Sequence, residues 1–210
     1  MKILIQARMG SKRLPGKMLM EINGEPLILF LLKRLCRRFD KKNIYVLTSD
    51  LGIDDILART CMDSNFSVFR GDEKDVFGRF KAFVDQHGLK NETLIRLTGD
   101  NVLIDLNLIN NVLEHHASRN SLFTSTRYIS LNRTIERFLP KGQSIDIFNS
   151  SVFDKINCAE LDDFDKEHVI PAFYRQLPYE LYKSSTDENY ISCSIDTERD
   201  LKQLKGLIKK

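Results

Sequence analysis

The residues best suited to chemistry lie in one loop close to the start of the chain. An apolar run at residues 3–5 precedes a segment, residues 7–17, that contains two glycines, a serine and a proline. The segment also carries four cationic side chains, which are Arg8, Lys12, Arg13 and Lys17. Four positive charges in one loop repel each other, and glycine lets backbone N–H groups approach an anion closely. This composition favours a polyphosphate ligand, although a solvent-exposed basic loop would have the same composition.

The two common phosphate-binding motifs do not account for this segment. Five residues separate Gly10 from Gly16, where the P-loop has four, and Met18 follows Lys17 in place of the Ser or Thr of the P-loop. The G-x-G-x-x-G pattern of dinucleotide-binding proteins does not follow the apolar run either. We therefore expect an anion-binding loop of another type.

Two aspartates at the ends of predicted strands are candidate metal ligands. Asp100 follows the apolar strand predicted at 93–97, and a carboxylate that faces a polyphosphate from a strand end suits Mg²⁺. Residues 99–101, Gly-Asp-Asn, are equally typical of a tight turn. Asp196 follows the strand predicted at 191–195 and would also serve as a cap of the last helix. The residue types alone leave both alternatives open.

Hydrophobic periodicity predicts alternating strands and helices that would position these residues. Such alternation is typical of βαβ units and a mostly parallel sheet, in which ligands bind beyond the carboxyl ends of the strands. An acidic loop is expected at 161–166, a helix broken near Pro171 at 167–175, and less regular chain at 125–142. The predicted strands are 3–5, 44–47, 66–69, 93–97, 122–126, 143–148 and 191–195, and the predicted helices are 25–39, 54–62, 75–87, 106–117, 151–156 and 197–208.

Length and composition restrict the class of protein. The 210 residues fit a single domain, 1–210, and the net charge of +3 is too small to predict a nucleic-acid surface. No apolar run is long enough to cross a bilayer, so we expect a cytoplasmic protein that binds neither nucleic acid nor membrane. The adjacent His115 and His116 are predicted to lie at the surface. The four cysteines are widely spaced and are expected to be buried, reduced thiols; they are Cys36, Cys61, Cys158 and Cys193.

Residues 6–17, Gln-Ala-Arg-Met-Gly-Ser-Lys-Arg-Leu-Pro-Gly-Lys, resemble the signature of a known family. This is the cytidylyltransferase family of spore-coat polysaccharide biosynthesis protein F, which is related to the acylneuraminate and ketodeoxyoctonate cytidylyltransferases. The resemblance implies a three-layer α/β/α sandwich with a mostly parallel sheet, of the nucleotide-diphospho-sugar transferase type. It also implies transfer of CMP from CTP to a hydroxyl of an acidic sugar, with Mg²⁺ as cofactor, in a homodimer that serves surface polysaccharide biosynthesis.

The same resemblance assigns roles to individual positions. Residues 96–100 and 195–201 are similar to the family segments whose aspartates bind metal, so Asp100 and Asp196 are expected to bind Mg²⁺ and, with Arg8 and Lys17, to be catalytic. The expected nucleotide-binding residues are Ala7, Arg8, Gly10, Ser11, Lys12, Arg13, Lys17, Arg70, Thr98 and Gly99, with Gly10 and Ser11 offering backbone N–H donors. The expected residues of the acceptor-sugar site are Arg79, Gln143, Asp146, Glu167 and His168.

Several alternatives stay open. Arg70 and Arg79 would equally suit surface ion pairs, and His168 suits either a general base or a hydrogen-bonded structural role. A sugar-1-phosphate nucleotidylyltransferase that uses UTP or dTTP would share the fold. A glycosyltransferase would need a D-x-D motif, whose spacing occurs at 163–165 in the acidic loop, and a non-catalytic nucleotide-binding regulator would bind CTP without turnover. Residues 125–148 are expected to cap the active site or contact a second subunit.

Overall fold

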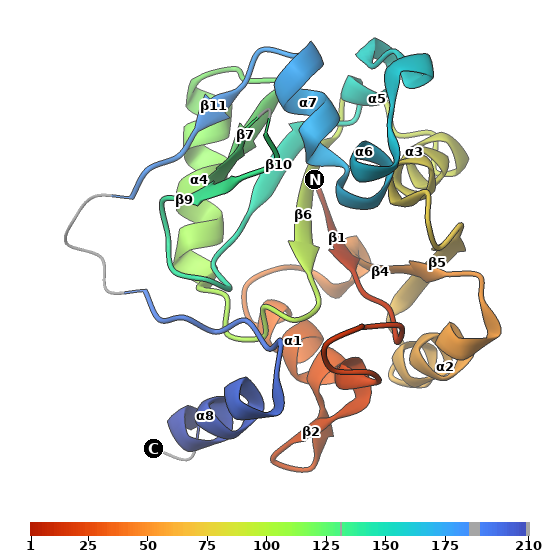
Figure 1. The fold of residues 1–210 in the computed structure, drawn as a ribbon, viewed down its shortest axis with the longest axis vertical. Coiled ribbons are helices and arrows are strands. Elements are labelled where there is room, and N and C mark those ends of the chain that lie inside the picture. The colour runs from red at the N-terminus through yellow and green to blue at the C-terminus, as the bar shows by residue number, and fades with distance from the viewer. Residues whose placement is uncertain (131, 185–189, 209–210) are drawn as a thin grey trace.

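The computed structural model describes residues 1–130, 132–184 and 190–208, and its centre is a seven-stranded sheet (Figure 1). Six strands run in the same direction, and β10 is antiparallel to both of its neighbours. The mostly parallel sheet expected from the sequence is therefore confirmed. In spatial order the strands are β11 (Glu180–Leu181), β7 (Phe123–Ser125), β10 (Asp146–Asn149), β6 (Thr93–Thr98), β1 (Lys2–Gln6), β4 (Ile44–Ser49) and β5 (Ser67–Gly71).

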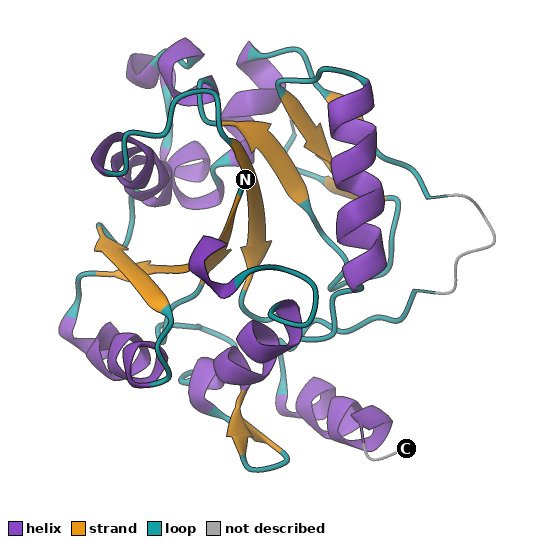
Figure 2. Ribbon diagram, turned by 180° about the vertical axis from the view of Figure 1, so that it is seen from behind, coloured by secondary structure: helices purple, strands orange, loops and turns teal. Residues whose placement is uncertain are grey.

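Helices cover both faces of this sheet and complete three layers (Figures 1 and 2). Successive side chains of a strand point to opposite faces, so Ile3 and Ile5 of β1 join one hydrophobic core and Leu4 joins the other. The first core includes α1 (Leu27–Leu35), α2 (Asp55–Asp63), α4 (Leu106–Ser118) and α8 (Glu198–Ile208), and the second includes α3 (Val76–Gln86), α5 (Val152–Lys155) and α7 (Ile170–Gln176). This arrangement confirms the predicted three-layer α/β/α sandwich.

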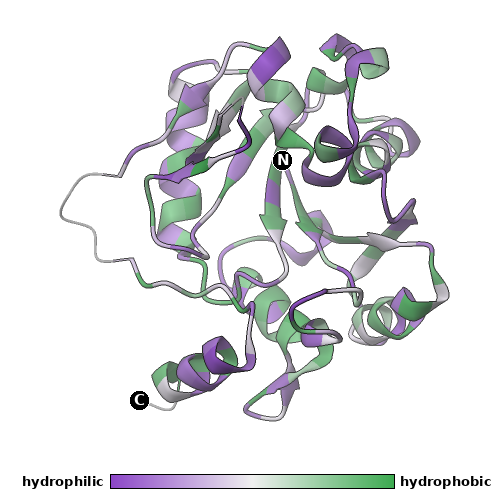
Figure 3. Cartoon of the chain, in the orientation of Figure 1, coloured by the Kyte–Doolittle hydropathy of each residue, from purple (hydrophilic) through white to green (hydrophobic). Residues whose placement is uncertain are grey.

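Hydropathy follows this layering. Figure 3 shows hydrophobic residues along much of α1, whereas much of α8 is polar. Within the part of the chain that the structure describes, every helix is too short or too polar to span a membrane.

All four cysteines are free thiols, as expected, but Cys158 is exposed and Cys36 is half-buried, so burial was predicted correctly for the other two.

Two elements near the chemistry differ from the sequence prediction. The acidic segment expected to be a loop forms α6 (Asp163–His168), because Asp162 and Asp165 make a reciprocal capping box at its first turn. The expected break in 167–175 lies at Val169, whose φ is +69°, rather than at Pro171. Proline is tolerated in the first turn of α7, since the N–H that it lacks would have no partner within the helix.

The predicted strand at 191–195 is also wrong, since the segment forms an isolated bridge from Ser194 to Asn101 and no extended pairing is described. The sequence pattern did not predict a short hairpin, β2 (Glu21–Ile22) with β3 (Glu25–Pro26). It also missed the antiparallel pair β8 (Arg127–Ile129) and β9 (Ile135–Arg137), which we call the ribbon. The ribbon lies in the expected excursion at 125–148, apart from residue 131, which lies outside the described residues.

Candidate active site

The site is built where β1 and β6 end side by side. Gln6 is paired with Thr98, and the Gly99 N–H donates to the Gln6 carbonyl oxygen at 2.9 Å. Residues 7–17, which we call the cationic loop, and residues 99–100 therefore leave the sheet together. A Cβ at Gly99 would lie 2.8 Å from the Met18 sulfur and 3.0 Å from Ala7 Cβ. A side chain at this position would therefore press on Met18 and Ala7, so glycine suits the close approach of the two loops.

The cationic loop is closed by its own backbone. The Met9 carbonyl oxygen accepts hydrogen bonds from the N–H groups of Ser11 at 2.8 Å and Gly16 at 3.0 Å. Gly16 has a φ of +72°, and the short helix that follows, η1 (Lys17–Leu19), turns Lys17 back towards the sheet. Leu14 is buried in the first core and anchors the tip of the loop. The Ser11 N–H is thus already bonded within the loop, which contradicts the prediction that it is free for a phosphate.

The structure brings Asp100 and Asp196 together around Lys17. The Lys17 Nζ lies 2.7 Å from Asp100 Oδ2 and 3.6 Å from Asp196 Oδ1, and it donates to the Ile195 carbonyl oxygen at 2.9 Å. The bridge between Asn101 and Ser194 places the two aspartate segments beside each other. Both carboxylates therefore face one point at the carboxyl ends of the central strands, as the sequence predicted.

Asp196 is also the centre of a cluster of positive charge. It accepts from Arg13 Nη2 at 2.7 Å and contacts Lys141 Nζ, and it is 3% exposed. Burial alone would raise the pKa of the Asp196 carboxyl. The opposing effect of Lys141, Lys17 and Arg13 is larger, so the pKa is below its usual value. The carboxylate is therefore ionised, and three cationic side chains contact it. The capping role proposed as an alternative falls to Thr197 and Asp200: the Thr197 hydroxyl accepts from the Asp200 N–H at 3.2 Å, and the Asp200 carboxylate accepts from the N–H groups of Asp196 and Thr197.

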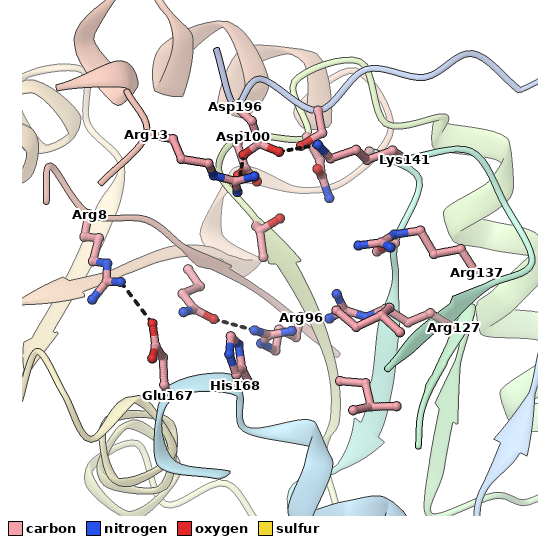
Figure 4. A pocket seen from close by; sticks show the side chains of 18 of the residues that line it. Arg8, Arg13, Arg96, Asp100, Arg127, Arg137, Lys141, Glu167, His168 and Asp196 are labelled. Carbon is pink, nitrogen blue, oxygen red and sulfur yellow. Dashed lines mark hydrogen bonds and ion pairs between the residues drawn. The ribbon is translucent and has the colours of Figure 1, made fainter. Parts of the chain in front are cut away.

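Two hollows meet at this point. The loop pocket has a volume of about 280 Å³ and lies under the cationic loop; the large cavity has a volume of about 640 Å³ (Figure 4). The residues that line both are Gln6, Arg8, Arg13, Thr98, Asp100 and Glu167. The loop pocket adds Ala7, Ser11, Lys12, Lys17, Met18 and Gly99. A ligand in the loop pocket and a second ligand in the large cavity would therefore meet beside Asp100.

Three arginines converge on the large cavity from separate elements: Arg96 of β6, and Arg127 and Arg137 of the ribbon (Figure 4). Two of them share a buried carboxylate, because Asp146 Oδ2 lies 2.7 Å from Arg96 Nη1 and 3.0 Å from Arg127 Nη2. Ser125 Oγ also donates to Asp146 at 2.7 Å. Burial alone would raise the pKa of the Asp146 carboxyl, but the opposing effect of Arg127 and Arg96 is larger, so the pKa is below its usual value. The carboxylate therefore stays ionised and holds two guanidinium groups in place.

The wall of the large cavity opposite the ribbon carries Glu167 and His168 from the end of α6 (Figure 4). Glu167 Oε1 accepts from Arg8 Nη2 at 3.2 Å. Burial lowers the pKa of His168 below its usual value, so the ring is neutral at pH 7. The positive φ of Val169 directly after it is a strained conformation for a β-branched residue. This strained link turns the chain so that His168 stays at the cavity wall.

Other predicted site residues serve the framework. The Arg70 guanidinium donates to the carbonyl oxygens of Ser49 and Leu51 and pairs with Asp55 at 2.7 Å. The Gln143 amide donates to the Ile191 carbonyl oxygen at 3.0 Å and accepts from the Asp105 N–H. Both side chains are thus committed to neighbouring segments, and neither is among the residues that line the two hollows.

Arg79, Asp146 and Gly10 are also absent from the lining of both hollows. Arg79 is 2% exposed inside α3, where burial lowers its pKa to about 10. Asp146 lies behind the arginines that it holds, and Gly10 faces Glu73. The residues 163–165 with D-x-D spacing belong to α6, where Asp165 is fully buried in an ion pair with Arg175. They do not form a metal site at a strand end.

The sequence pattern did not assign a role to Arg96, Arg127 or Arg137. Arg96 stands in a strand that is otherwise mostly apolar, and a buried arginine requires a partner. That requirement was a signal for Asp146, which lies opposite Arg96 in the register of β10 and β6. The position of Arg137 depends on the ribbon, which the sequence pattern did not predict.

Comparison with solved structures defines the class of protein. The chain is similar to a cytidylyltransferase from Leptospira borgpetersenii serovar Hardjo-bovis, with a TM-score of 0.85 and 28% identity over 99% of this chain and 86% of the other. It shares its fold with a CMP:2-keto-3-deoxy-manno-octonic acid synthetase complexed with CTP, with a TM-score of 0.69 and 16% identity over 99% of this chain and 98% of the other. The fold is thus that of nucleotidyltransferases of the nucleotide-diphospho-sugar type.

Sequence comparison then gives the family. The cytidylyltransferase family model matches residues 2–208. The chain is 34% identical to the spore coat polysaccharide biosynthesis protein SpsF of Bacillus subtilis (strain 168), over 99% of this chain and 85% of that protein. The protein belongs to the cytidylyltransferase family, as the motif at residues 6–17 predicted.

Proposed function

We propose that this protein is a sugar cytidylyltransferase that transfers CMP from CTP to a hydroxyl of an acidic sugar for surface polysaccharide biosynthesis. The observation that carries the proposal is the meeting of the loop pocket and the large cavity beside Asp100, with Asp196 and Lys17 at the same point. A nucleotidyl transfer needs this arrangement, because the α-phosphorus of the nucleotide must face the acceptor hydroxyl.

The triphosphate would occupy the loop pocket. The four cationic side chains of the loop supply positive charge there: Arg8, Lys12, Arg13 and Lys17. The adjoining outer cleft, of about 610 Å³, shares Arg8, Lys12 and Glu167 with this pocket and continues towards residues 72–75. Residues 70–72 and 75–80 resemble the family segments that border the nucleotide and the sugar, so we assign the nucleoside to the outer cleft.

Mg²⁺ fits the pair of carboxylates. Among the described residues, no three His, Cys, Asp or Glu side chains gather into a metal cluster. An ion held by Asp100 and Asp196 would therefore complete its six ligands with phosphate oxygens and water, which is the usual coordination of Mg²⁺ in nucleotide enzymes. Lys17 Nζ contacts both carboxylates, so the ion would take the place of this ammonium group between them. When bound, Mg²⁺ supplies positive charge that polarises the phosphoryl oxygens.

The residues of the chain then act by position and charge. The acceptor oxygen forms a bond with the α-phosphorus as the bond to pyrophosphate breaks, and the hydroxyl proton is released. Lys17, Arg13 and Arg8 would stabilise the negative charge that develops on the departing pyrophosphate. Their own positions are fixed by contacts with Asp100, Asp196 and Glu167.

The arginines of the large cavity support an acidic acceptor. Arg96 and Arg127 share the single carboxylate of Asp146, and Arg137 adds a third positive charge from the ribbon. A guanidinium grips a carboxylate with two parallel hydrogen bonds. We infer that the acceptor carboxylate binds on this side of the cavity, while its reacting hydroxyl points towards Asp100.

The proposal is tested in two steps. Calorimetric titration with CTP, UTP, dTTP and ATP measures the nucleotide preference, and we expect CTP to bind most tightly. Pyrophosphate release is then measured with acidic 2-keto sugars and with sugar 1-phosphates as acceptors. Release with CTP and an acidic sugar supports the proposal. Preference for UTP or dTTP with a sugar 1-phosphate would show the related nucleotidylyltransferase, and CTP binding without release from any acceptor would show a regulator.

A further inference from the structure

A buried carboxylate outside the two hollows is hydrogen-bonded to the start of the cationic loop, at Met9. Asp54 ends the short helix η3 (Gly52–Asp54), directly before α2, and is 1% exposed. Its Oδ1 accepts from the Met9 N–H at 2.7 Å, across 45 positions of sequence. Its Oδ2 accepts from the Thr48 hydroxyl at 2.9 Å and from the Ser49 N–H at 3.0 Å, and also from the Ser49 hydroxyl. One carboxylate thus joins the end of β4 to the loop that follows β1.

Met9 is the residue through which the loop is closed. Its carbonyl oxygen accepts from the N–H groups of Ser11 and Gly16, so both ends of the loop meet there. Its N–H belongs to the peptide group between Arg8 and Met9, and Arg8 lines the loop pocket, the large cavity and the outer cleft. The bond to Asp54 therefore fixes the orientation of the peptide that directs Arg8 and begins the loop.

The charge of Asp54 strengthens this bond. Burial alone would raise the pKa of the Asp54 carboxyl. Hydrogen bonds from Ser49, Met9 and Thr48 have the larger, opposite effect, so the pKa is lowered and the carboxylate is ionised at neutral pH. A hydrogen bond from a backbone N–H to an ionised acceptor is about twice as strong as one between neutral groups.

We propose that Asp54 is a positioning residue for nucleotide binding, which holds the peptide between Arg8 and Met9 so that the cationic loop keeps the shape that receives the phosphates. The inference rests on the proposed function, because it assigns the triphosphate to the loop pocket. Asp54 itself touches neither hollow. It acts through Met9 at Oδ1, whereas its Oδ2 contacts with Thr48 and Ser49 are internal to the β4–α2 connection.

Because Oδ1 and Oδ2 of Asp54 have different partners, single substitutions can separate the bond to Met9 from the bonds to Thr48 and Ser49. Binding of CTP and of inorganic triphosphate to the full chain is measured by calorimetry without an acceptor, together with the melting temperature. We expect Asp54→Ala to weaken binding of both ligands at least tenfold. Thr48→Val removes one Oδ2 contact but leaves Met9 bonded, so it should lower the melting temperature and leave both affinities within twofold. Asp63→Ala, which removes an exposed carboxylate at the end of the following helix α2, should change neither quantity.

Asp54→Ala carries a second cost, because Asp54 is the foremost negative charge that favours the ionised, buried Arg79. If this variant does not fold, Asp54→Asn replaces it, since the amide keeps the size of the side chain but its one neutral oxygen is a weaker acceptor for the Met9 N–H than the ionised carboxylate is. We then expect at least a threefold loss of affinity in the folded variant.

The failure of this inference differs from the failure of the proposed function. Wild-type protein that binds no CTP would refute the proposed function. If the wild type binds CTP and a folded Asp54 variant binds it equally well, the positioning role is refuted. An equal loss of affinity in Thr48→Val would also overturn it, because the effect would then follow stability rather than the bond to Met9.

Discussion

Removal of the carboxylate of Asp146 tests the structure of the large cavity. Asp146 is 1% exposed and lies 2.7 Å from Arg96 Nη1 and 3.0 Å from Arg127 Nη2. In Asp146→Ala both guanidinium groups keep their charge and lose their common partner. Breaking a buried ion pair by removing one partner costs about 3–5 kcal/mol. For a chain of this length each kcal/mol lowers the melting temperature by about 2–4 °C, so we expect a decrease of roughly 6–20 °C.

The same variant should impair acceptor binding selectively. Without Asp146, Arg96 and Arg127 lose their fixed orientation, so the KM for an acidic acceptor should rise more than the KM for CTP. Thermal unfolding followed by circular dichroism gives the stability, and steady-state kinetics give the two KM values. The control is Asp85→Ala, because Asp85 is exposed and pairs with Lys81 at 2.9 Å on the surface of α3.

An exposed pair of that kind contributes about 0.5 kcal/mol or less, so the control should melt within about 2 °C of the wild type. The reasoning is refuted if Asp146→Ala melts as close to the wild type as the control does and leaves the acceptor KM unchanged. It is also refuted if both KM values rise equally, since the arginines would then not belong to the acceptor alone.

Two further predictions concern the metal and pH. Lys17 contacts both candidate metal ligands, so Lys17→Met should increase the affinity of the nucleotide-free protein for Mn²⁺ at least tenfold, measured by electron paramagnetic resonance; equal binding by both proteins would contradict this competition. Burial lowers the pKa of His116 below its usual value of about 6.5. The unfolded chain therefore takes up a proton first as pH falls, and the free energy of unfolding should decrease below about pH 6.5. His116→Gln should weaken this decrease in urea unfolding at pH 5 to 7, and an unchanged profile would exclude His116 as its source.

The sheet and the centre of the site were predictable because their signals are local. Short apolar strands alternating with amphipathic helices specify a parallel sheet, and ligands bind where such strands end. The cationic loop and Asp100 each follow one of these strands directly, so they meet once β1 and β6 pair. Asp196 was placed correctly although its strand was not, because the bridge of Ser194 to Asn101 is sufficient to position it.

The acceptor side was less predictable because it depends on pairing between distant segments. Asp146 lies beside Arg96 and Ser125 through the register of β10 with β6 and β7. A one-residue change in that register would turn the side chain to the other face. His116 was expected at the surface but is buried, with Nδ1 2.9 Å from the Thr124 hydroxyl, because α4 packs this side of the helix against β7. The homodimer, the cytoplasmic location and the single domain stay predictions.

The proposed function requires that Asp100 and Asp196 hold Mg²⁺, and that Lys17 holds the triphosphate, where the loop pocket meets the large cavity. The most direct measurement is pyrophosphate release from CTP by Asp100→Ala and Lys17→Ala, in the presence of the acidic sugar that the wild type uses. Loss of a charged group that acts in the transition state costs about 10²–10³ in rate, so we predict at least about a 100-fold decrease in each folded variant. Turnover at the wild-type rate in both folded variants would contradict the claim.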